Sequence, residues 1–233
     1  MPASAWEFEG DFSREGRSPH SDDPVGALVR RARERQEEGI APNAIVGELL
    51  ALGRVYERRG DRDARVKVDA AVEQYVGLVT GRLAERARRD SLTGLLNHAA
   101  FHARLKAETA RARRYNGRLA LALFDLDRFK ETNDREGHQE GDRLLREFAR
   151  ALAVTVRESD SVGRLGGDEF GAILLETEPK RLASFLDRLY GRLPPEISVS
   201  AGAAFFPTEA STVDQLVAHA DERLYAHKAA RAA

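Results

Sequence analysis

The stretch Gly166-Gly167-Asp168-Glu169-Phe170 lies between two apolar runs and decides how the second half of this chain folds. Two consecutive glycines allow a strand to reverse in a tight hairpin, because glycine adopts positive φ angles without steric penalty. Strands are therefore predicted over residues 161–165 and 170–175, with the turn at Gly166 and Gly167. The two acids that follow, Asp168 and Glu169, are expected to project from the apex of this hairpin.

A second acidic cluster, Asp125-Leu126-Asp127, ends an apolar strand predicted over residues 119–124. Both acidic groups can then meet at one edge of the sheet. Carboxylate oxygens are hard ligands suited to Mg²⁺ or Mn²⁺, and Mg²⁺ usually keeps waters and substrate phosphates in its remaining positions. The sequence therefore predicts that the chain does its chemistry at a divalent-cation site formed by these acids.

Composition excludes several classes of function. A net charge of −1 and a pI near 6.6 give no electrostatic basis for binding bulk nucleic acid or a membrane surface. The chain has no cysteine, so disulfides, thiolate catalysis and cysteine-based zinc sites are excluded. No apolar run approaches the roughly 20 residues that a membrane span needs, and no signal peptide is recognised. We therefore expect a soluble, cytoplasmic protein.

The first 89 residues are expected to be separate from the rest. Residues 1–23 are rich in Ser, Pro, Gly, Asp and Arg and indicate a flexible tail. Residues 24–89 indicate an all-helical regulatory or dimerisation module, with helices over 24–38, 43–59 and 61–89 and Asn43 as an N-cap. The long third helix carries an apolar stripe that either pairs with a second copy of the chain or packs on the two preceding helices: Val68, Val72, Tyr75, Val79 and Leu83.

Residues 90–233 show a mixed pattern of helices and strands. The order of strand, helix, hairpin, helix and strand is that of a ferredoxin-like α+β fold. We therefore predict a mostly antiparallel sheet flanked by helices, similar to a polymerase palm. Helices are expected over 97–115, 141–156, 179–189 and 211–228, and the remaining strand over 197–205.

The motifs of this second region closely resemble those of the GGDEF family of diguanylate cyclases, over about residues 90–229. The resemblance covers several motifs in the family's order and spacing: residues 90–97, 124–130 with Asn133 and Asp134, 137–142, 164–170, 200–202 and 220–228. It implies the condensation of two GTP molecules into cyclic di-GMP and pyrophosphate. It also implies a homodimer, in which each 3′-hydroxyl attacks the α-phosphate of the nucleotide held by the partner.

The resemblance assigns roles to the acidic residues. It implies that Asp125, the main-chain carbonyl of Leu126 and Asp168 hold a metal ion, with Glu169 at a second metal position. Either Asp168 or Glu169 would accept the proton of the 3′-hydroxyl, and the sequence does not choose between them. Asp127 is interpreted instead as a hydrogen-bonding residue within its loop.

The resemblance also implies residues that recognise the substrate. Asn133 and Asp142 match the guanine-contacting positions, where a carboxylate can accept hydrogen bonds from N1–H and the 2-amino group. The alternatives are that Asn133 is a helix cap and Asp142 a solvated acid in a first helical turn. His138 matches a position near the nucleotide, or it caps the following turn.

Two lysines, Lys130 and Lys228, match phosphate-contacting positions, which suit a mobile ammonium group. Beyond Lys228 the chain departs from the family's Gly-Arg-Asn ending, and Arg231 is a candidate for the missing cation.

Arg157-Glu158-Ser159-Asp160 precedes Gly166 by five intervening residues, which is the spacing of the family's RxxD inhibitory site. The resemblance implies that cyclic di-GMP binds there and restrains the enzyme, with Arg188 as a second arginine. Arginine pairs bidentately with phosphate and stacks on guanine, although an Arg–Asp salt bridge at a helix end is the simpler interpretation. The alternative function is a catalytically silent receptor for cyclic di-GMP.

Overall fold

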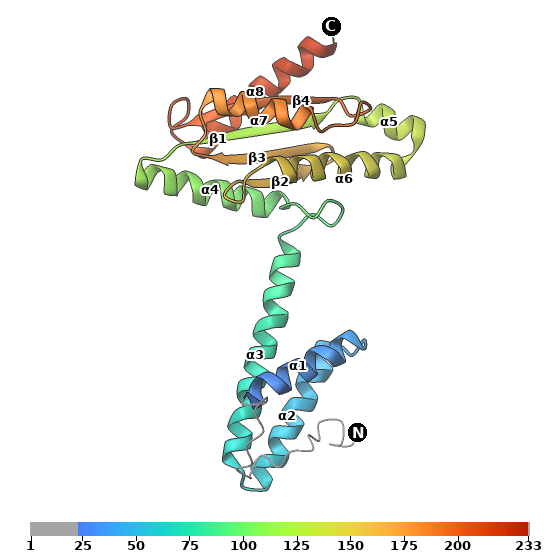
Figure 1. Ribbon diagram of the computed structural model, residues 1–233, viewed down its shortest axis with the longest axis vertical. Coiled ribbons are helices and arrows are strands. Elements are labelled where there is room, and N and C mark those ends of the chain that lie inside the picture. Colours follow the sequence, from blue (N-terminus) through green and yellow to red (C-terminus); the bar gives the residue numbers. More distant parts are fainter. Residues whose placement is uncertain (1–22, 233) are drawn as a thin grey trace. The chain divides into compact units, whose positions relative to one another are not determined.

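The computed structural model describes residues 23–232 (Figure 1). The chain divides between Ala87 and Arg88 into two compact units, two residues earlier than the boundary expected from the sequence. The tail expected over residues 1–23 lies outside the described residues except for Asp23. Among residues 23–232, no helix is both long enough and apolar enough to cross a membrane.

The first unit consists of α1 (Pro24–Glu37), α2 (Pro42–Arg58) and α3 (Arg62–Ala87). Asp23 caps α1, because its carboxylate accepts a hydrogen bond of 2.9 Å from the N–H of Gly26. The prediction that Asn43 caps α2 is wrong. The cap position is Ala41, which makes no side-chain bond, and Pro42 begins the helix because its fixed φ suits the first helical position.

The apolar stripe of α3 packs on α1 and α2 along most of its length. Val68 and Tyr75 are fully buried, and Val72 and Val79 are partly buried against the same cluster. The Tyr75 hydroxyl donates a hydrogen bond of 3.1 Å to the side chain of Gln36. Leu83 differs from the other four because it is 58% exposed. Packing on the preceding helices therefore accounts for the stripe up to Val79 but not for its last residue.

The second unit contains a four-stranded antiparallel sheet in the order β2-β3-β1-β4, which confirms the α+β prediction. Its strands are β1 (Leu119–Leu126), β2 (Ser161–Gly166), β3 (Glu169–Leu175) and β4 (Val199–Phe206). Its helices are α4 (His98–Tyr115), α5 (Phe129–Glu136), α6 (His138–Thr155), α7 (Pro179–Tyr190) and α8 (Val213–Ala232).

The central strand β1 separates two apolar cores. Ala120, Ala122 and Phe124 face the core formed with α6 and α7, and Leu119, Leu121 and Leu123 face the core formed with α4 and α8. A strand covered on both faces needs apolar side chains at successive positions. This explains the uninterrupted apolar run before Asp125, and it places the acidic residues where the strand leaves the core.

Several predicted boundaries were wrong by two or more residues, and one helix was missed. α6 begins at His138 rather than Gly141, β4 begins at Val199 rather than Ile197, and α8 continues past Lys228 to Ala232. The missed helix α5 has no buried residue, so it lacks the apolar face that would reveal it in the sequence.

Candidate active site

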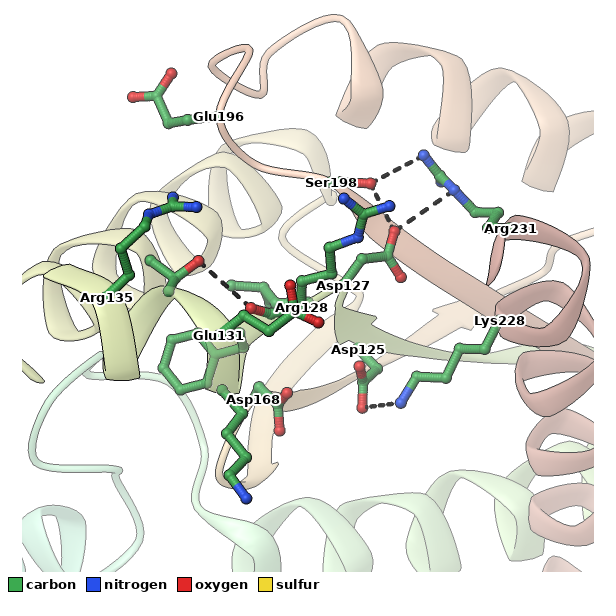
Figure 2. Close-up of a pocket in the computed structure, with 14 residues that line it drawn as sticks. Asp125, Asp127, Arg128, Glu131, Arg135, Asp168, Glu196, Ser198, Lys228 and Arg231 are labelled. Atoms are coloured by element: carbon green, nitrogen blue, oxygen red, sulfur yellow. Dashed lines mark hydrogen bonds and ion pairs between the residues drawn. The ribbon is translucent and has the colours of Figure 1, made fainter. Parts of the chain in front are cut away.

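The predicted acidic cluster lies at one end of β1, beside a pocket of about 700 Å³. Asp125 is the register partner of Glu169 on β3 and of Ser200 on β4, so three strands meet at its position. Figure 2 shows the pocket, which is lined by Asp125, Leu126, Asp127, Arg128, Phe129, Lys130, Glu131, Thr132, Arg135, Asp168, Glu196, Ser198, Lys228 and Arg231.

The hairpin turn differs by one residue from the prediction. Gly166 ends β2, and the turn consists of Gly167 and Asp168. Gly167 has a φ of +46°, in the left-handed region that glycine adopts most easily. The N–H of Leu126 donates a hydrogen bond of 3.3 Å to the carbonyl of Asp168, which fixes the turn against the end of β1. Asp168 thus lies in the turn itself, whereas Glu169 begins β3.

Asp125 is a buried acid with one close cationic partner. It is 5% exposed, and its Oδ2 lies 2.5 Å from the Nζ of Lys228 on α8. Burial raises the pKa of Asp125, and the negative charge of Asp168 raises it further, whereas the hydrogen bond with Lys228 acts in the opposite direction. The net result is a pKa above the usual value for an aspartate.

Asp127 is a hydrogen-bonding residue, but its partners lie on and next to β4 rather than within its own loop. Its two carboxylate oxygens accept hydrogen bonds of 2.6 Å from the hydroxyls of Ser198 and Ser200. Arg231 adds an ion pair with Asp127 at 3.5 Å (Figure 2). It also donates to the carbonyl of Val199 at 3.0 Å. These contacts attach the loop after β1 to β4 and to the last turn of α8.

The oxygen donors of this pocket fit a divalent cation of the Mg²⁺ type. Among residues 23–232, no group of three or more His, Cys, Asp or Glu side chains is placed to hold an ion. Asp125 and Asp168 are close enough to interact electrostatically, and the main-chain carbonyl of Leu126 is adjacent. Two carboxylates with a carbonyl leave positions for waters and phosphate oxygens, as Mg²⁺ prefers. Glu169 is exposed and does not line the pocket.

The predicted substrate residues fall into two groups. Lys130 and Lys228 line the pocket together with the acids. Asn133 on α5 and Asp142 on α6 are not among the residues that line the pocket. The Asn133 Oδ1 covers Gly141 so closely that a Cβ there would lie 2.0 Å away. Asp142 forms an ion pair of 3.6 Å with Arg146. His138 is exposed and is the first residue of α6, whose cap position is Gly137.

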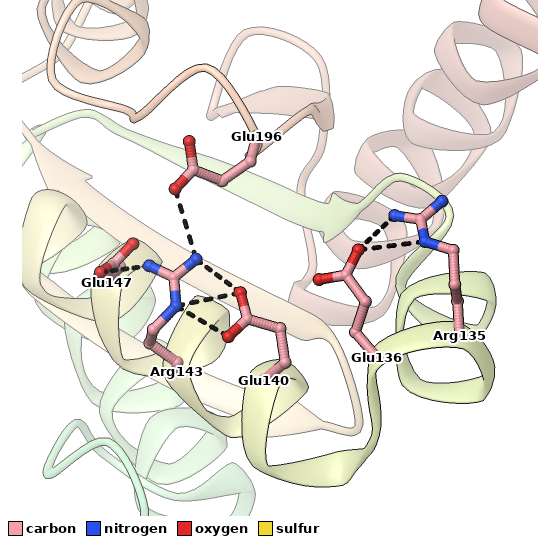
Figure 3. A network of polar contacts seen from close by, with 6 residues as sticks. All are labelled: Arg135, Glu136, Glu140, Arg143, Glu147 and Glu196. Carbon is pink, nitrogen blue, oxygen red and sulfur yellow. Dashed lines mark hydrogen bonds and ion pairs between the residues drawn. The ribbon is translucent and has the colours of Figure 1, made fainter.

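A network around Arg143 was not foreseen from the sequence (Figure 3). The guanidinium of Arg143 contacts Glu140 at 2.6 Å, Glu147 at 2.6 Å and Glu196 at 3.3 Å. Hydrogen bonds with Glu140 and Glu147 raise the pKa of Arg143 further. Because Glu196 lines the pocket, this network connects α6 with the segment that enters β4. Residues so distant in sequence leave no local signal of their contact.

The predicted inhibitory residues come together in the second unit, between the C-terminal end of α6, β3 and α7. Arg157, Asp160 and Arg188 line one small pocket with Arg181 and Phe185. The carboxylate of Asp160 accepts backbone hydrogen bonds from Arg157 at 3.1 Å and from Leu175 at 3.0 Å. Asp160 therefore fixes the turn between α6 and β2. The contact between Arg157 and Asp160 runs through the backbone N–H of Arg157 and not through its guanidinium.

Comparison with known proteins identifies the family. A family model described as diguanylate cyclase, GGDEF domain, matches residues 87–233. The chain belongs to the GGDEF family. The diguanylate cyclase TpbB of Pseudomonas aeruginosa is 35% identical over 224 residues, which cover 88% of this chain and 49% of that protein. The chain thus spans about half the length of this curated relative.

Two solved structures that contain GGDEF domains resemble more of this chain than the sheet and the helices around it. The coiled coil and GGDEF domain of DgcB from Caulobacter crescentus, in complex with c-di-GMP, has a TM-score of 0.66 and 27% identity, covering 72% of this chain and 94% of that one. The diguanylate cyclase SiaD from Pseudomonas aeruginosa, in complex with its activator SiaC, has a TM-score of 0.61 and 29% identity, covering 88% of this chain and 83% of that one.

Proposed function

We propose that this GGDEF protein is a diguanylate cyclase that condenses two GTP molecules into cyclic di-GMP with release of pyrophosphate. The observation that supports this most directly is the pocket that Asp125 and Asp168 share with Lys130 and Lys228. Two acids suited to a divalent cation and two lysines suited to phosphate oxygens match the polar groups of a nucleoside triphosphate.

Each group has a defined task in the proposed reaction. Asp125, the Leu126 carbonyl and Asp168 hold Mg²⁺ or Mn²⁺, which when bound neutralises the triphosphate and favours ionisation of the attacking hydroxyl. Asp168 or Glu169 takes the proton of the 3′-hydroxyl while the hydroxyl oxygen forms a bond to the α-phosphorus of the other nucleotide. The bond from that phosphorus to the β-phosphate breaks, and pyrophosphate leaves. Two such transfers, one in each direction, close the cyclic dinucleotide.

Base selection is assigned to Asn133 and Asp142. An ionised carboxylate accepts from N1–H and the 2-amino group of guanine, whereas adenine has no N1–H to donate. The close approach of the Asn133 Oδ1 and of Phe129, which lines the pocket, to Gly141 supports this role, because Gly141 directly precedes Asp142. His138, on the first turn of α6, is assigned to the same side of the nucleotide.

The reaction as proposed needs two copies of the chain. One pocket holds one triphosphate, so the attacking 3′-hydroxyl belongs to a nucleotide on a second copy. The helical unit is assigned the task of bringing the copies together, and the exposed Leu83 on α3 supports this. The likeness to SiaD, whose structure contains an activator protein, favours a regulatory role for the same helices.

The product is proposed to restrain the enzyme at the pocket of Arg157, Asp160 and Arg188. The guanidinium of Arg157 supplies paired donors for a phosphate or a guanine edge. Because both oxygens of Asp160 already accept backbone hydrogen bonds, its first task is to hold Arg157 in position. The DgcB structure, which contains c-di-GMP, supports product binding in this family.

Incubation of the purified chain with GTP and Mg²⁺ tests the proposal. We expect cyclic di-GMP by mass spectrometry, with two pyrophosphates released for each product molecule. Asp168→Ala serves as the control, because it removes one pocket acid and should yield no product. Binding of cyclic di-GMP without any pyrophosphate release would instead show a silent receptor and contradict the cyclase assignment.

A further inference from the structure

The ion pair with Lys228 engages the carboxylate of Asp125, to which the proposed function assigns a divalent cation. The side chain of Asp125 is 7% exposed and that of Lys228 is 41% exposed, and 2.5 Å separates their charged atoms. A buried carboxylate is costly unless a cation or hydrogen-bond donors compensate its charge. In this structure the ammonium of Lys228 is the closest compensating charge (Figure 2).

The backbone of α8 is fixed on both sides of Lys228. α8 lies so close to β4 that a Cβ on Gly202 would meet the N of Leu224 at 2.1 Å. One residue before the lysine, the Nδ1 of His227 accepts a hydrogen bond of 2.9 Å from the N–H of Ala201. One turn later, Arg231 donates to the carbonyl of Val199 at 3.0 Å. An exchange at Asp125 therefore requires movement of the flexible Lys228 side chain but no displacement of α8 from β4.

We propose that Lys228 is the resident counter-ion of Asp125 and that a divalent cation and this ammonium alternate at the carboxylate. Two cations at one buried carboxylate repel each other strongly, because the surroundings screen charge poorly. A divalent cation that binds Asp125 therefore displaces the ammonium. The displaced ammonium, which is partly exposed at the pocket wall, then faces the space assigned to the triphosphate, so this inference rests on the proposed function.

The exchange couples the cation to the nucleotide. A divalent cation alone must break the ion pair with Lys228 and leaves the ammonium without an anionic partner. A cation that arrives with a triphosphate supplies that partner, because phosphate oxygens accept from the ammonium. Binding of the cation and the nucleotide is thus mutually reinforcing, and Lys228 keeps the affinity of the empty pocket for divalent cations low.

Mn²⁺ binding to the nucleotide-free full chain tests the exchange. Free Mn²⁺ is measured by electron paramagnetic resonance for the wild type, Lys228→Met and the matched control Lys130→Met. Both variants remove one lysine that lines the pocket, but only Lys228 contacts Asp125. We expect Lys228→Met to tighten Mn²⁺ binding about tenfold and Lys130→Met to tighten it only about twofold. Equal tightening in the two variants would reflect general charge alone and would overturn the proposal.

A second measurement uses the wild-type chain and does not depend on the folding of a variant. Lysines are labelled with an acetylating reagent, with and without Mg²⁺ and without nucleotide, and each site is quantified by peptide mass spectrometry. We expect Mg²⁺ to raise labelling of Lys228 severalfold and to leave the exposed Lys106 on α4 unchanged. Unchanged or reduced labelling of Lys228 would refute the exchange.

Neither measurement requires turnover, so the exchange can fail while the cyclase assignment stands. A protein without cyclase activity that still shows the expected Mn²⁺ binding and lysine labelling would refute the cyclase assignment but support the exchange at Asp125. Asp125→Asn provides the control for the site, because it should abolish the Mn²⁺ binding that Lys228→Met strengthens.

Discussion

Arg164 is the residue whose replacement we expect to disturb the active-site turn most directly. Its Nε and Nη2 donate hydrogen bonds of 2.9 and 2.7 Å to the carbonyl of Gly167. Its Nη1 lies 3.3 Å from the Oδ1 of Asp90, and the two side chains are 16% and 21% exposed. Asp90 in turn accepts hydrogen bonds from the N–H and hydroxyl of Thr93 at 2.9 and 2.7 Å. Arg164 therefore joins the turn of Asp168 to the first loop of the GGDEF unit.

Replacing Arg164 with Met keeps much of the side-chain length and removes its bonds to Gly167 and Asp90. A hydrogen bond contributes about 0.5–1.5 kcal/mol net, and more when one partner is charged. Two bonds to Gly167 and one to Asp90, discounted for partial exposure, give a loss of about 2–3 kcal/mol in the free energy of unfolding. For a unit of this size the melting temperature should fall by about 4–10 °C.

Calorimetry of the full chain measures the change, and a double-mutant cycle with Asp90→Asn isolates the pair. We expect a coupling free energy of about 1 kcal/mol between the two positions. A cycle that is additive within error would show that the ion pair contributes nothing. An unchanged melting temperature in Arg164→Met would refute the whole reasoning about this connection.

The ion pair between Asp90 and Arg164 also predicts how the free energy of unfolding depends on pH. Burial raises the pKa of Asp90, but hydrogen bonds from Thr93 and the charge of Arg164 more than offset this, so the pKa lies below its usual value. An acid with a lowered folded-state pKa stabilises the protein above its unfolded-state pKa, and this stabilisation is lost as pH falls through the folded-state value. The stability difference between wild type and Asp90→Asn should therefore stay constant above about pH 5 and shrink as the pH falls below about 4.

Three further substitutions test separate parts of the proposed function. Asp168→Ala should lower turnover by at least about 10³-fold, because it removes a metal-binding carboxylate. The melting temperature should stay unchanged, because no core contact is lost. Near-normal rates of pyrophosphate release would exclude Asp168 from the site. Asp142→Ser should admit ATP by removing the acceptor for guanine N1–H, and a mass spectrum that still contains only cyclic di-GMP from mixed nucleotides would contradict that role. Arg157→Ala should weaken product inhibition by about 10–100-fold in inhibition constant, and unchanged inhibition would place the product elsewhere.

Local patterns in the sequence predicted the elements that have strong local causes. The run from Leu119 to Phe124 was recognised as a strand because it is apolar at every position, which a strand buried on both faces requires. α5 was missed for the opposite reason, since it has no buried residue and therefore no apolar period. The turn was placed one residue early because both Gly166 and Gly167 accept the conformation that only Gly167 adopts.

Long-range contacts could be predicted only where strand ends indicated a common sheet edge or where the family resemblance assigned residues to one site. The resemblance brought Asp125, Asp168 and Lys228 together, but the hydrogen bond between Ser198 and Asp127 joins residues 71 positions apart and has no local pattern. The same holds for the bond between Glu196 and Arg143. Such pairs depend on the register of β1 with β4 and on the approach of α6, which only the folded chain specifies.

The central position of β1 has a consequence for synthesis of the chain on the ribosome. Its two edges pair with β3 and β4, both of which are translated later. At translation rates of about 5–20 residues per second, β4 emerges roughly 4–16 seconds after β1. During that interval an apolar segment with at least one open edge is exposed to other nascent chains. Translation that stalls between β3 and β4 should therefore yield an aggregation-prone fragment, and chaperone binding should concentrate in that window.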